Sequence, residues 1–95
     1  MYAYHATLKE FLPSIAQKGL FAQFSDVYNE DVIFVERNYD QKAIYRGGEK
    51  GVMLRLTIDG IGDTELGEYV IWDTLSIHSS KIKFELFPNT WKPLA

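Results

Sequence analysis

The chain has 95 residues and a formal net charge of −3, with 46% hydrophobic and 15% aromatic residues. This length predicts a single domain over residues 1–95 with a core of its own, and the excess of acids argues against non-specific binding to nucleic-acid phosphates. The lack of cysteine excludes disulfides and thiolate metal sites. No segment resembles a signal peptide or reaches the ~20 apolar residues of a membrane span, so we expect a cytoplasmic location.

Residues 1–19 predict a strand followed by a helix. Met1–Thr7 alternates around aromatic residues, which is typical of a short strand. Thr7 and Glu10 have the spacing of a capping box, so Thr7 can cap a helix that ends at Lys18-Gly19. Pro13 interrupts the pattern, so the helix begins or kinks there. We expect the inward face of this helix to consist of Phe11, Leu12 and Ile15.

Residues 20–46 predict a buried strand and a second helix. An irregular stretch ends in a turn at residues 29–31, before the apolar run Val32–Val35, which is typical of a buried strand. Asn38 can then cap a short helix over Tyr39–Arg46. Gly47-Gly48 would end this helix.

The second half of the chain predicts strands. Gly51–Asp59 alternates as a half-exposed strand, whose outer face would consist of Met53, Arg55 and Thr57. A loop rich in glycine and acids leads to Glu68, which lies directly before the apolar run Tyr69–Trp72. This run is typical of a buried strand, so a carboxylate at its start makes Glu68 a candidate functional residue. After a turn at Ser76–Ser80, Lys81–Phe87 alternates as a last strand.

The order of these elements predicts the fold class. Strands dominate, and both short helices lie in the first half of the chain. The predicted class is therefore α+β with a largely antiparallel sheet. Residues 88–95 lack a clear pattern, and we expect them to form a loosely attached tail.

Three segments carry a family resemblance. Tyr4-His5-Ala6-Thr7 resembles a first-strand motif that is usually His-Gly-Ser or His-Gly-Thr, and Val32–Tyr45 resembles a strand and helix that end in a tyrosine. Gly67–Asp73, followed by Lys81–Phe84, resembles a strand that carries a glutamate. In this order the segments resemble the His-Tyr-Glu signature of the ADP-ribosyltransferase superfamily, in its poly(ADP-ribose) polymerase-like branch. The resemblance implies a minimal single-domain form of that fold, with a split sheet.

The resemblance also implies a reaction and the residues that perform it. NAD would be the substrate, and its ADP-ribose would move to a macromolecular target with release of nicotinamide. Glu68 would be the catalytic carboxylate, because cleavage of the nicotinamide–ribose bond passes through an oxocarbenium-like centre that a fixed negative charge stabilises. Residues of the first two motifs would hold NAD: His5, Ala6, Thr7, Phe34 and Tyr45.

The chain departs from the family pattern at several positions. Ala6 replaces the glycine of the first motif, and Phe34 falls on a strand tyrosine and lacks its hydroxyl. Lys42 falls where the family often has a serine that bonds the nicotinamide amide. Leu66 stands where arginine-specific relatives place a second glutamate, so arginine is disfavoured as the acceptor.

Other functions remain open. The departures favour a non-catalytic binding protein or inhibitor of the same fold that acts on a protein partner, for example in phage anti-defence. The Tyr-His-x-Thr strand and the helix end Lys18-Gly19-Leu20 also resemble RNA 2′-phosphotransferases, which generally rely on several arginines. The two histidines, His5 and His78, lack the short-spaced partners of a metal site. We expect a protein acceptor rather than a nucleic acid, and a bacterial or phage setting.

Overall fold

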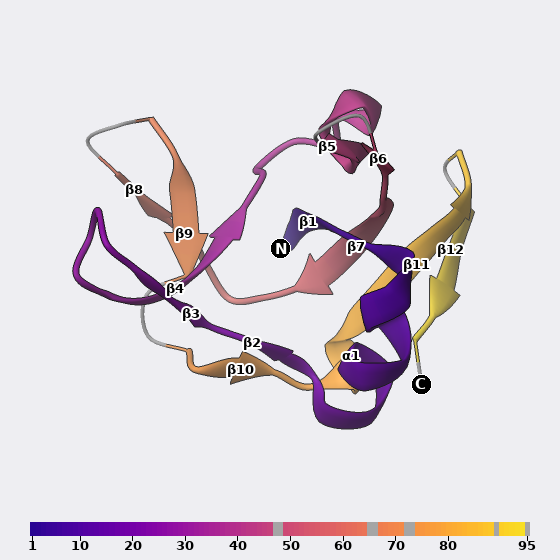
Figure 1. The fold of residues 1–95 in the computed structure, drawn as a ribbon, viewed down its shortest axis with the longest axis horizontal. Coiled ribbons are helices and arrows are strands. Elements are labelled where there is room, and N and C mark those ends of the chain that lie inside the picture. The colour runs from indigo at the N-terminus through magenta and orange to yellow at the C-terminus, as the bar shows by residue number, and fades with distance from the viewer. Residues whose placement is uncertain (47–48, 65–66, 72–73, 89, 95) are drawn as a thin grey trace.

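The computed structural model describes residues 1–46, 49–64, 67–71, 74–88 and 90–94. Its strands form two antiparallel sheets of four strands, in the orders β1-β7-β11-β12 and β3-β4-β9-β8 (Figure 1). The first sheet consists of β1 (Tyr2–Thr7), β7 (Val52–Thr57), β11 (Ile82–Phe87) and β12 (Thr90–Pro93). The second sheet consists of β3 (Gln23–Ser25), β4 (Glu30–Val35), β9 (Tyr69–Ile71) and β8 (Gly62–Asp63). The predicted α+β class with mostly antiparallel sheets is confirmed.

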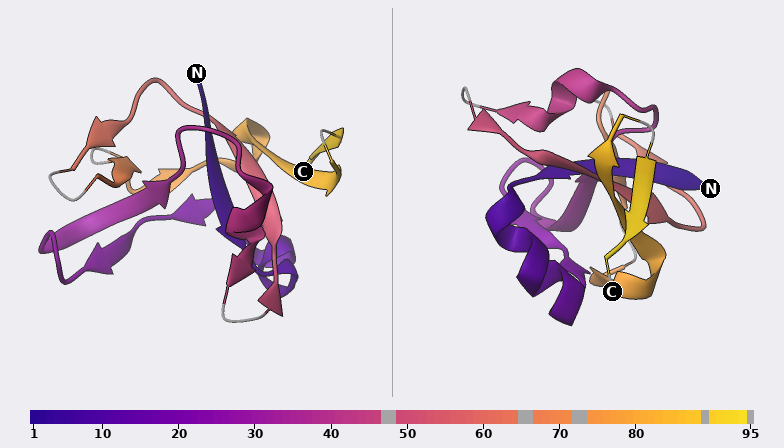
Figure 2. Two further views of the ribbon diagram at one scale, coloured as in Figure 1. Left: turned by 90° about the horizontal axis from the view of Figure 1, so that it is seen from above. Right: turned by 90° about the vertical axis from the view of Figure 1, so that its right-hand side faces the viewer.

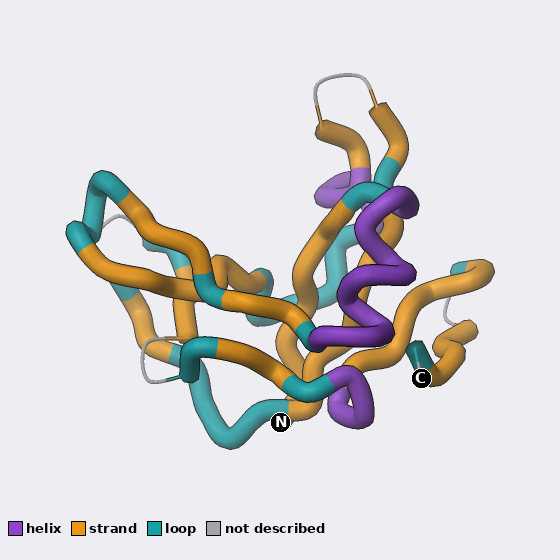
Figure 3. Tube along the Cα trace, turned by 60° about the horizontal axis from the view of Figure 1, so that its bottom comes forward, coloured by secondary structure: helices purple, strands orange, loops and turns teal. Residues whose placement is uncertain are grey.

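Two short strand pairs and four helical segments complete the described part of the chain. The pairs join β2 (Leu20–Phe21) to β10 (Ser76–Ile77), and β5 (Tyr45–Arg46) to β6 (Glu49–Lys50). The helical segments are η1 (Lys9–Phe11), α1 (Leu12–Lys18), η2 (Gln41–Ile44) and η3 (Ser79–Lys81), drawn in purple in Figure 3. Among these described segments α1 is an α-helix and the other three are 3-10 turns. None of the helices in the described residues could cross a membrane.

The first helix begins later than the capping-box pattern predicts. Thr7 remains in β1, where it pairs with Val52, and the residue that precedes η1 makes no side-chain cap. Pro13 lies in the first turn of α1, where its missing N–H leaves no intrahelical bond unmade. Ile15 is buried as expected, whereas Phe11 is 49% exposed, so its predicted inward position is wrong. The helix ends at Gly19, whose N–H donates to the carbonyl of Ile15 at 2.8 Å.

The second predicted helix is reduced to the single turn η2. The Asp40 side chain, rather than Asn38, accepts a hydrogen bond from the backbone N–H of Lys42 at 3.0 Å, so the turn starts late. The ring of Tyr39 is held in contact with the rings of Tyr4 and Trp91. The chain then pairs as β5 with β6, and the predicted helix stop Gly47-Gly48 lies outside the described residues. Long-range contacts thus override the local helix pattern.

The end of the chain is paired. β12 runs antiparallel to β11, with Trp91 opposite Glu85 and Lys92 opposite Phe84. Thr90–Pro93 therefore form an edge strand, where the sequence predicts a loosely attached tail. The aromatic ring of Trp91 accounts for the difference, because it packs with Tyr4 and Tyr39 on the outer face of the first sheet.

The buried side chains lie mainly between the two sheets and α1. The core cluster consists of Ala3, Ile15, Leu20, Ile33, Val35, Leu54, Leu56, Ile71, Ile77 and Ile82. Met53 is also fully buried at 0% exposure, although the alternation predicts that it faces outward. The central strand β7 is covered there because η2 contacts it.

One bridge joins β1 to the end of β4. The backbone N–H of Tyr4 donates to the carbonyl of Glu36 at 2.9 Å, and the N–H of Glu36 donates to the carbonyl of Tyr4 at 2.7 Å. Away from this bridge the two strands run in different directions, as the left view of Figure 2 shows. Because β1 and β4 diverge beyond the bridge, residues of both sheets face the space between the two strands.

Candidate functional site

A cleft of about 590 Å³ lies where β1 and β4 separate. Its lining comes from β1 and the residues after it, from the end of β4, from η2 and the start of β7, and from the turn before β9. The lining residues are Tyr4, His5, Ala6, Thr7, Leu8, Phe11, Phe34, Val35, Glu36, Ile44, Gly51, Gly67, Glu68 and Tyr69. Five residues that the sequence predicts as site residues are among them: His5, Ala6, Thr7, Phe34 and Glu68.

His5 connects the two sheets at the cleft. It lies on β1 opposite Leu54, and its Nδ1 is 2.7 Å from the carbonyl oxygen of Phe34 on β4. Because a carbonyl oxygen can only accept, Nδ1 carries the proton in this contact. In the neutral imidazole the other nitrogen, Nε2, is then an acceptor. The contact thus determines both the orientation of the ring and its tautomer.

Glu68 lies at the rim of the cleft with a well-anchored backbone. Its N–H donates to Oγ1 of Thr64 at 3.0 Å, and its carbonyl accepts the N–H of Thr64 at 2.9 Å. The preceding Gly67 has a φ of 79°, a left-handed conformation that other residues rarely adopt, so a glycine is required in this turn. The side chain of Glu68 is exposed, and its Oε1 accepts a hydrogen bond from the Tyr28 hydroxyl at 3.4 Å.

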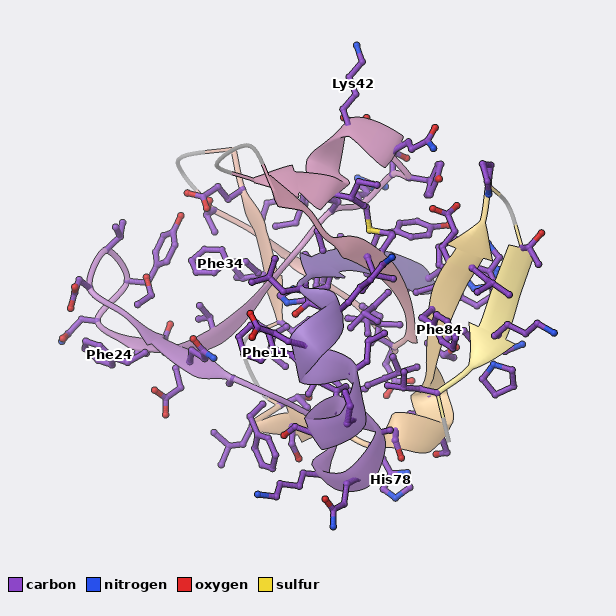
Figure 4. All side chains as sticks on the ribbon, turned by 45° about the vertical axis from the view of Figure 1, so that its right-hand side comes forward. Phe11, Phe24, Phe34, Lys42, His78 and Phe84 are labelled. Carbon is purple, nitrogen blue, oxygen red and sulfur yellow. The ribbon has the colours of Figure 1, made fainter. Side chains whose placement is uncertain are left out.

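Aromatic side chains form part of the cleft wall. Phe34 is 39% exposed although it lies on the well-paired strand β4, and Phe11 reaches the cleft from η1 (Figure 4). The Phe34 ring contacts the ring of Tyr28, with 6.1 Å between centroids and 44° between planes. An exposed, supported ring of this kind can stack on a planar heterocycle.

A glycine shapes the floor of the cleft. A Cβ atom on Gly51 would lie 2.3 Å from the carbonyl oxygen of Thr7 and 3.2 Å from that of Ile44. Only a residue without a side chain lets the chain directly before β7 approach the ends of β1 and η2 this closely. Ala6 and Thr7 are held beside this contact by their pairing with Met53 and Val52.

The charged groups near the cleft are mixed. Among the described lining residues the ionised groups are the carboxylates Glu36 and Glu68, with no lysine or arginine. Arg37 lies next to Glu36, and its guanidinium carbon is 6.0 Å from the centroid of the Tyr69 ring, which lines the cleft. Arg37 therefore supplies a positive charge at the rim.

Two residues of the second family-like segment, Lys42 and Tyr45, are not among the described residues that line the cleft. The side chain of Tyr45 lies outside the described part of the structure; its backbone follows Ile44, which lines the cleft. Lys42 is exposed and projects away from the body of the molecule, so it does not contribute to the described lining (Figure 4).

The histidine outside the cleft has a local role. His78 precedes η3, and its Nδ1 accepts the backbone N–H of Ser80 at 3.1 Å, which matches the turn predicted there. A second cleft of about 630 Å³ includes His78 and Lys81 but no predicted catalytic or NAD-binding residue. Within the described ranges no three histidine or acidic side chains could hold a metal ion.

The sequence does not mark Tyr28, Arg37 or Phe11 as site residues. Tyr28 and Glu68 are separated by 40 positions, so no local pattern connects them. Phe11 has the spacing of an inward helical residue, and only the late start of α1 turns it toward the cleft. No family model, curated protein or solved structure matches this chain.

Proposed function

We propose that the cleft binds NAD and that the chain transfers ADP-ribose from NAD to a macromolecular acceptor. One observation carries the proposal: His5, Phe34 and Glu68 come from segments far apart in the chain and line the same cleft. The family resemblance assigns complementary roles to these three residues. Their meeting in one cleft of suitable volume for part of a dinucleotide supports that assignment.

The proposed binding mode follows from the chemistry of the wall. The nicotinamide ring stacks on the exposed ring of Phe34, and the ribose hydroxyls bond to Thr7 and to the Nε2 side of His5. The diphosphate extends toward Arg37, because the charged groups of the described lining are the carboxylates Glu36 and Glu68, which would repel it.

Glu68 stabilises the transition state. The C1′–N bond of the nicotinamide riboside breaks, its electron pair stays with nicotinamide, and positive charge develops on the ribose. The carboxylate at the rim stabilises this charge and can accept a hydrogen bond from the 2′-hydroxyl. The acceptor nucleophile then bonds to C1′ and loses a proton to solvent. Nicotinamide leaves as a neutral molecule, so a general acid is not required.

The acceptor is proposed to be a protein. The hairpin formed by β3 and β4 lies beside Glu68 through the contact with Tyr28, and it exposes Asp26, Glu30 and Asp31. Three carboxylates at this position repel a phosphate backbone. A protein with a basic or neutral surface can approach without this penalty.

Release of nicotinamide from NAD tests the proposal. Replacement Glu68→Gln keeps the size of the side chain and removes its charge, so we expect the rate to fall on the order of 100-fold. Glu30→Gln is the matched control, because Glu30 is exposed on the same sheet and outside the described lining of the cleft. Equal rates for wild type and Glu68→Gln would refute the role of Glu68.

A second candidate is a non-catalytic binding protein. The exposed apolar side chains of the β3–β4 hairpin favour it, since Phe24 is 60% and Val27 is 69% exposed. Calorimetric titration with NAD separates the two candidates. Absence of NAD binding, together with a stable complex with a protein partner, would support the binding protein and contradict the transferase.

A further inference from the structure

Tyr28 contacts both the aromatic wall and the carboxylate of the proposed active site. Its hydroxyl donates to Oε1 of Glu68 at 3.4 Å, and its ring lies 6.1 Å from the ring of Phe34. It belongs to the turn between β3 and β4, whereas Glu68 precedes β9. One side chain thus spans from the hairpin to the turn that carries Glu68.

The turn around Tyr28 is anchored by Ser25. The buried Ser25 accepts the N–H of Tyr28 on its hydroxyl oxygen at 3.4 Å and the N–H of Asn29 on its carbonyl at 2.7 Å. Asn29 has a φ of 55°, which asparagine tolerates better than most residues. The Tyr28 ring therefore leaves the turn from a backbone that is held on both sides.

We infer that Tyr28 is a positioning residue that orients the carboxylate of Glu68 for catalysis. The inference rests on the proposed function. An exposed glutamate side chain samples several rotamers, and the rate depends on the fraction in which the carboxylate faces the ribose. A hydrogen bond to Oε1 favours one arrangement and leaves Oε2 for the 2′-hydroxyl. The ring of Tyr28 also supports Phe34, so a single residue aligns the stacking wall and the carboxylate.

The variant Tyr28→Phe isolates the hydroxyl, because the phenylalanine ring can keep the contact with Phe34. Since the hydrogen bond is long, we expect a moderate effect: kcat for nicotinamide release falls about 3- to 10-fold. KM for NAD stays unchanged. Tyr2→Phe is the matched control, because it removes the hydroxyl of a tyrosine on the opposite, outer face of the first sheet.

A double-mutant cycle distinguishes positioning from a general structural effect. In the Glu68→Gln background the addition of Tyr28→Phe should have no further effect on kcat, because the carboxylate that it orients is gone. An equal loss in both backgrounds would overturn the inference. An unchanged kcat in Tyr28→Phe, with an active wild type, would overturn it as well.

A measurement independent of turnover tests the contact itself. In protein labelled with ¹³C at the glutamate carboxyl carbons, the Glu68 signal is assigned by its loss in Glu68→Gln. We expect Tyr28→Phe, but not Tyr2→Phe, to shift this signal. An unshifted signal would refute the contact. If wild type released no nicotinamide, the proposed function and the catalytic role of Tyr28 would both fail, and the carboxyl signal would still decide whether the two side chains are in contact.

Discussion

Aromatic side chains gather in two regions of this molecule, and the regions differ in how completely their rings are covered. On the outer face of the first sheet, the rings of Tyr4, Tyr39 and Trp91 contact one another, with centroids 5.8 to 6.0 Å apart. The guanidinium carbon of Arg55 lies 4.3 Å from the ring centroid of Tyr2 and 4.9 Å from that of Trp91. The half-buried residues Tyr4, Tyr39 and Trp91 form the outer aromatic group, of which Tyr4 also borders the cleft.

The cleft presents the opposite situation. Phe11 and Phe34 line it and keep large exposed areas, and the ring partner of Phe34 is Tyr28, which itself belongs to a turn. In the outer aromatic group the rings pack against one another, and the Tyr39 hydroxyl donates a hydrogen bond to Glu85. The comparison indicates that the outer group stabilises the fold, whereas the less covered rings of the cleft are the ones to which we assign the proposed binding of NAD.

Removal of Trp91 should have the largest effect on stability. Trp91→Ala deletes ring contacts with Tyr4 and Tyr39 and the cation–π contact with Arg55, so the free energy of unfolding should fall by about 2–3 kcal/mol. Urea denaturation measures this change, and Thr90→Ala in the same strand is the control. A folded Trp91→Ala variant that had lost NAD binding would contradict the division between the two regions.

Removal of the Phe34 side chain should weaken the binding of NAD and leave the stability of the fold nearly unchanged. Phe34→Ala takes away a half-exposed ring of the cleft but keeps the backbone carbonyl that accepts from His5, so the unfolding free energy should change by less than about 1 kcal/mol. The affinity for NAD should weaken about 3- to 10-fold, the usual range for one aromatic stacking contact.

Calorimetric titration with NAD checks this prediction against a second phenylalanine of the same sheet. Phe24→Ala removes an even more exposed ring that lies outside the described lining of the cleft. Its affinity for NAD should match that of wild type. Equal losses in the two variants would mean that the effect does not come from stacking in the cleft.

The longer strands of the fold could be predicted from the sequence because their signals are local. The alternation in β1, β7 and β11 and the apolar run in β4 each fall within a few consecutive residues. Strands of two to four residues, such as β8 and β12, are too short to show a period. The prediction of a second helix over Tyr39–Arg46 is wrong in extent, because the contacts that hold Tyr39 come from distant strands.

The same distinction applies to the candidate site. His5, Phe34 and Glu68 could be selected because each lies in a motif whose order along the chain is itself informative. Tyr28 and Arg37 contact the lining residues Glu68 and Tyr69 through the arrangement of the hairpin and of the strand ends, which no local pattern encodes. The closeness of Gly51 to Thr7 likewise depends on where two strands meet.

The smallest predicted effect concerns the titration of the outer aromatic group. Partial burial, the hydrogen bond to Glu85 and the charge of Glu85 raise the pKa of Tyr39 from 10.0 to about 12. Since the unfolded chain then releases this proton first, the stabilisation is complete below pH 10 and is lost as the pH rises toward 12. Wild type should therefore lose more unfolding free energy over this interval than Tyr39→Phe, which has no phenol to ionise at this position. The difference in absorbance at 295 nm between the two proteins follows the ionisation directly. A midpoint at 10.0 would show that neither burial nor Glu85 disfavours the ionised phenol of Tyr39, and the titration would then give no support to the better coverage of the outer group.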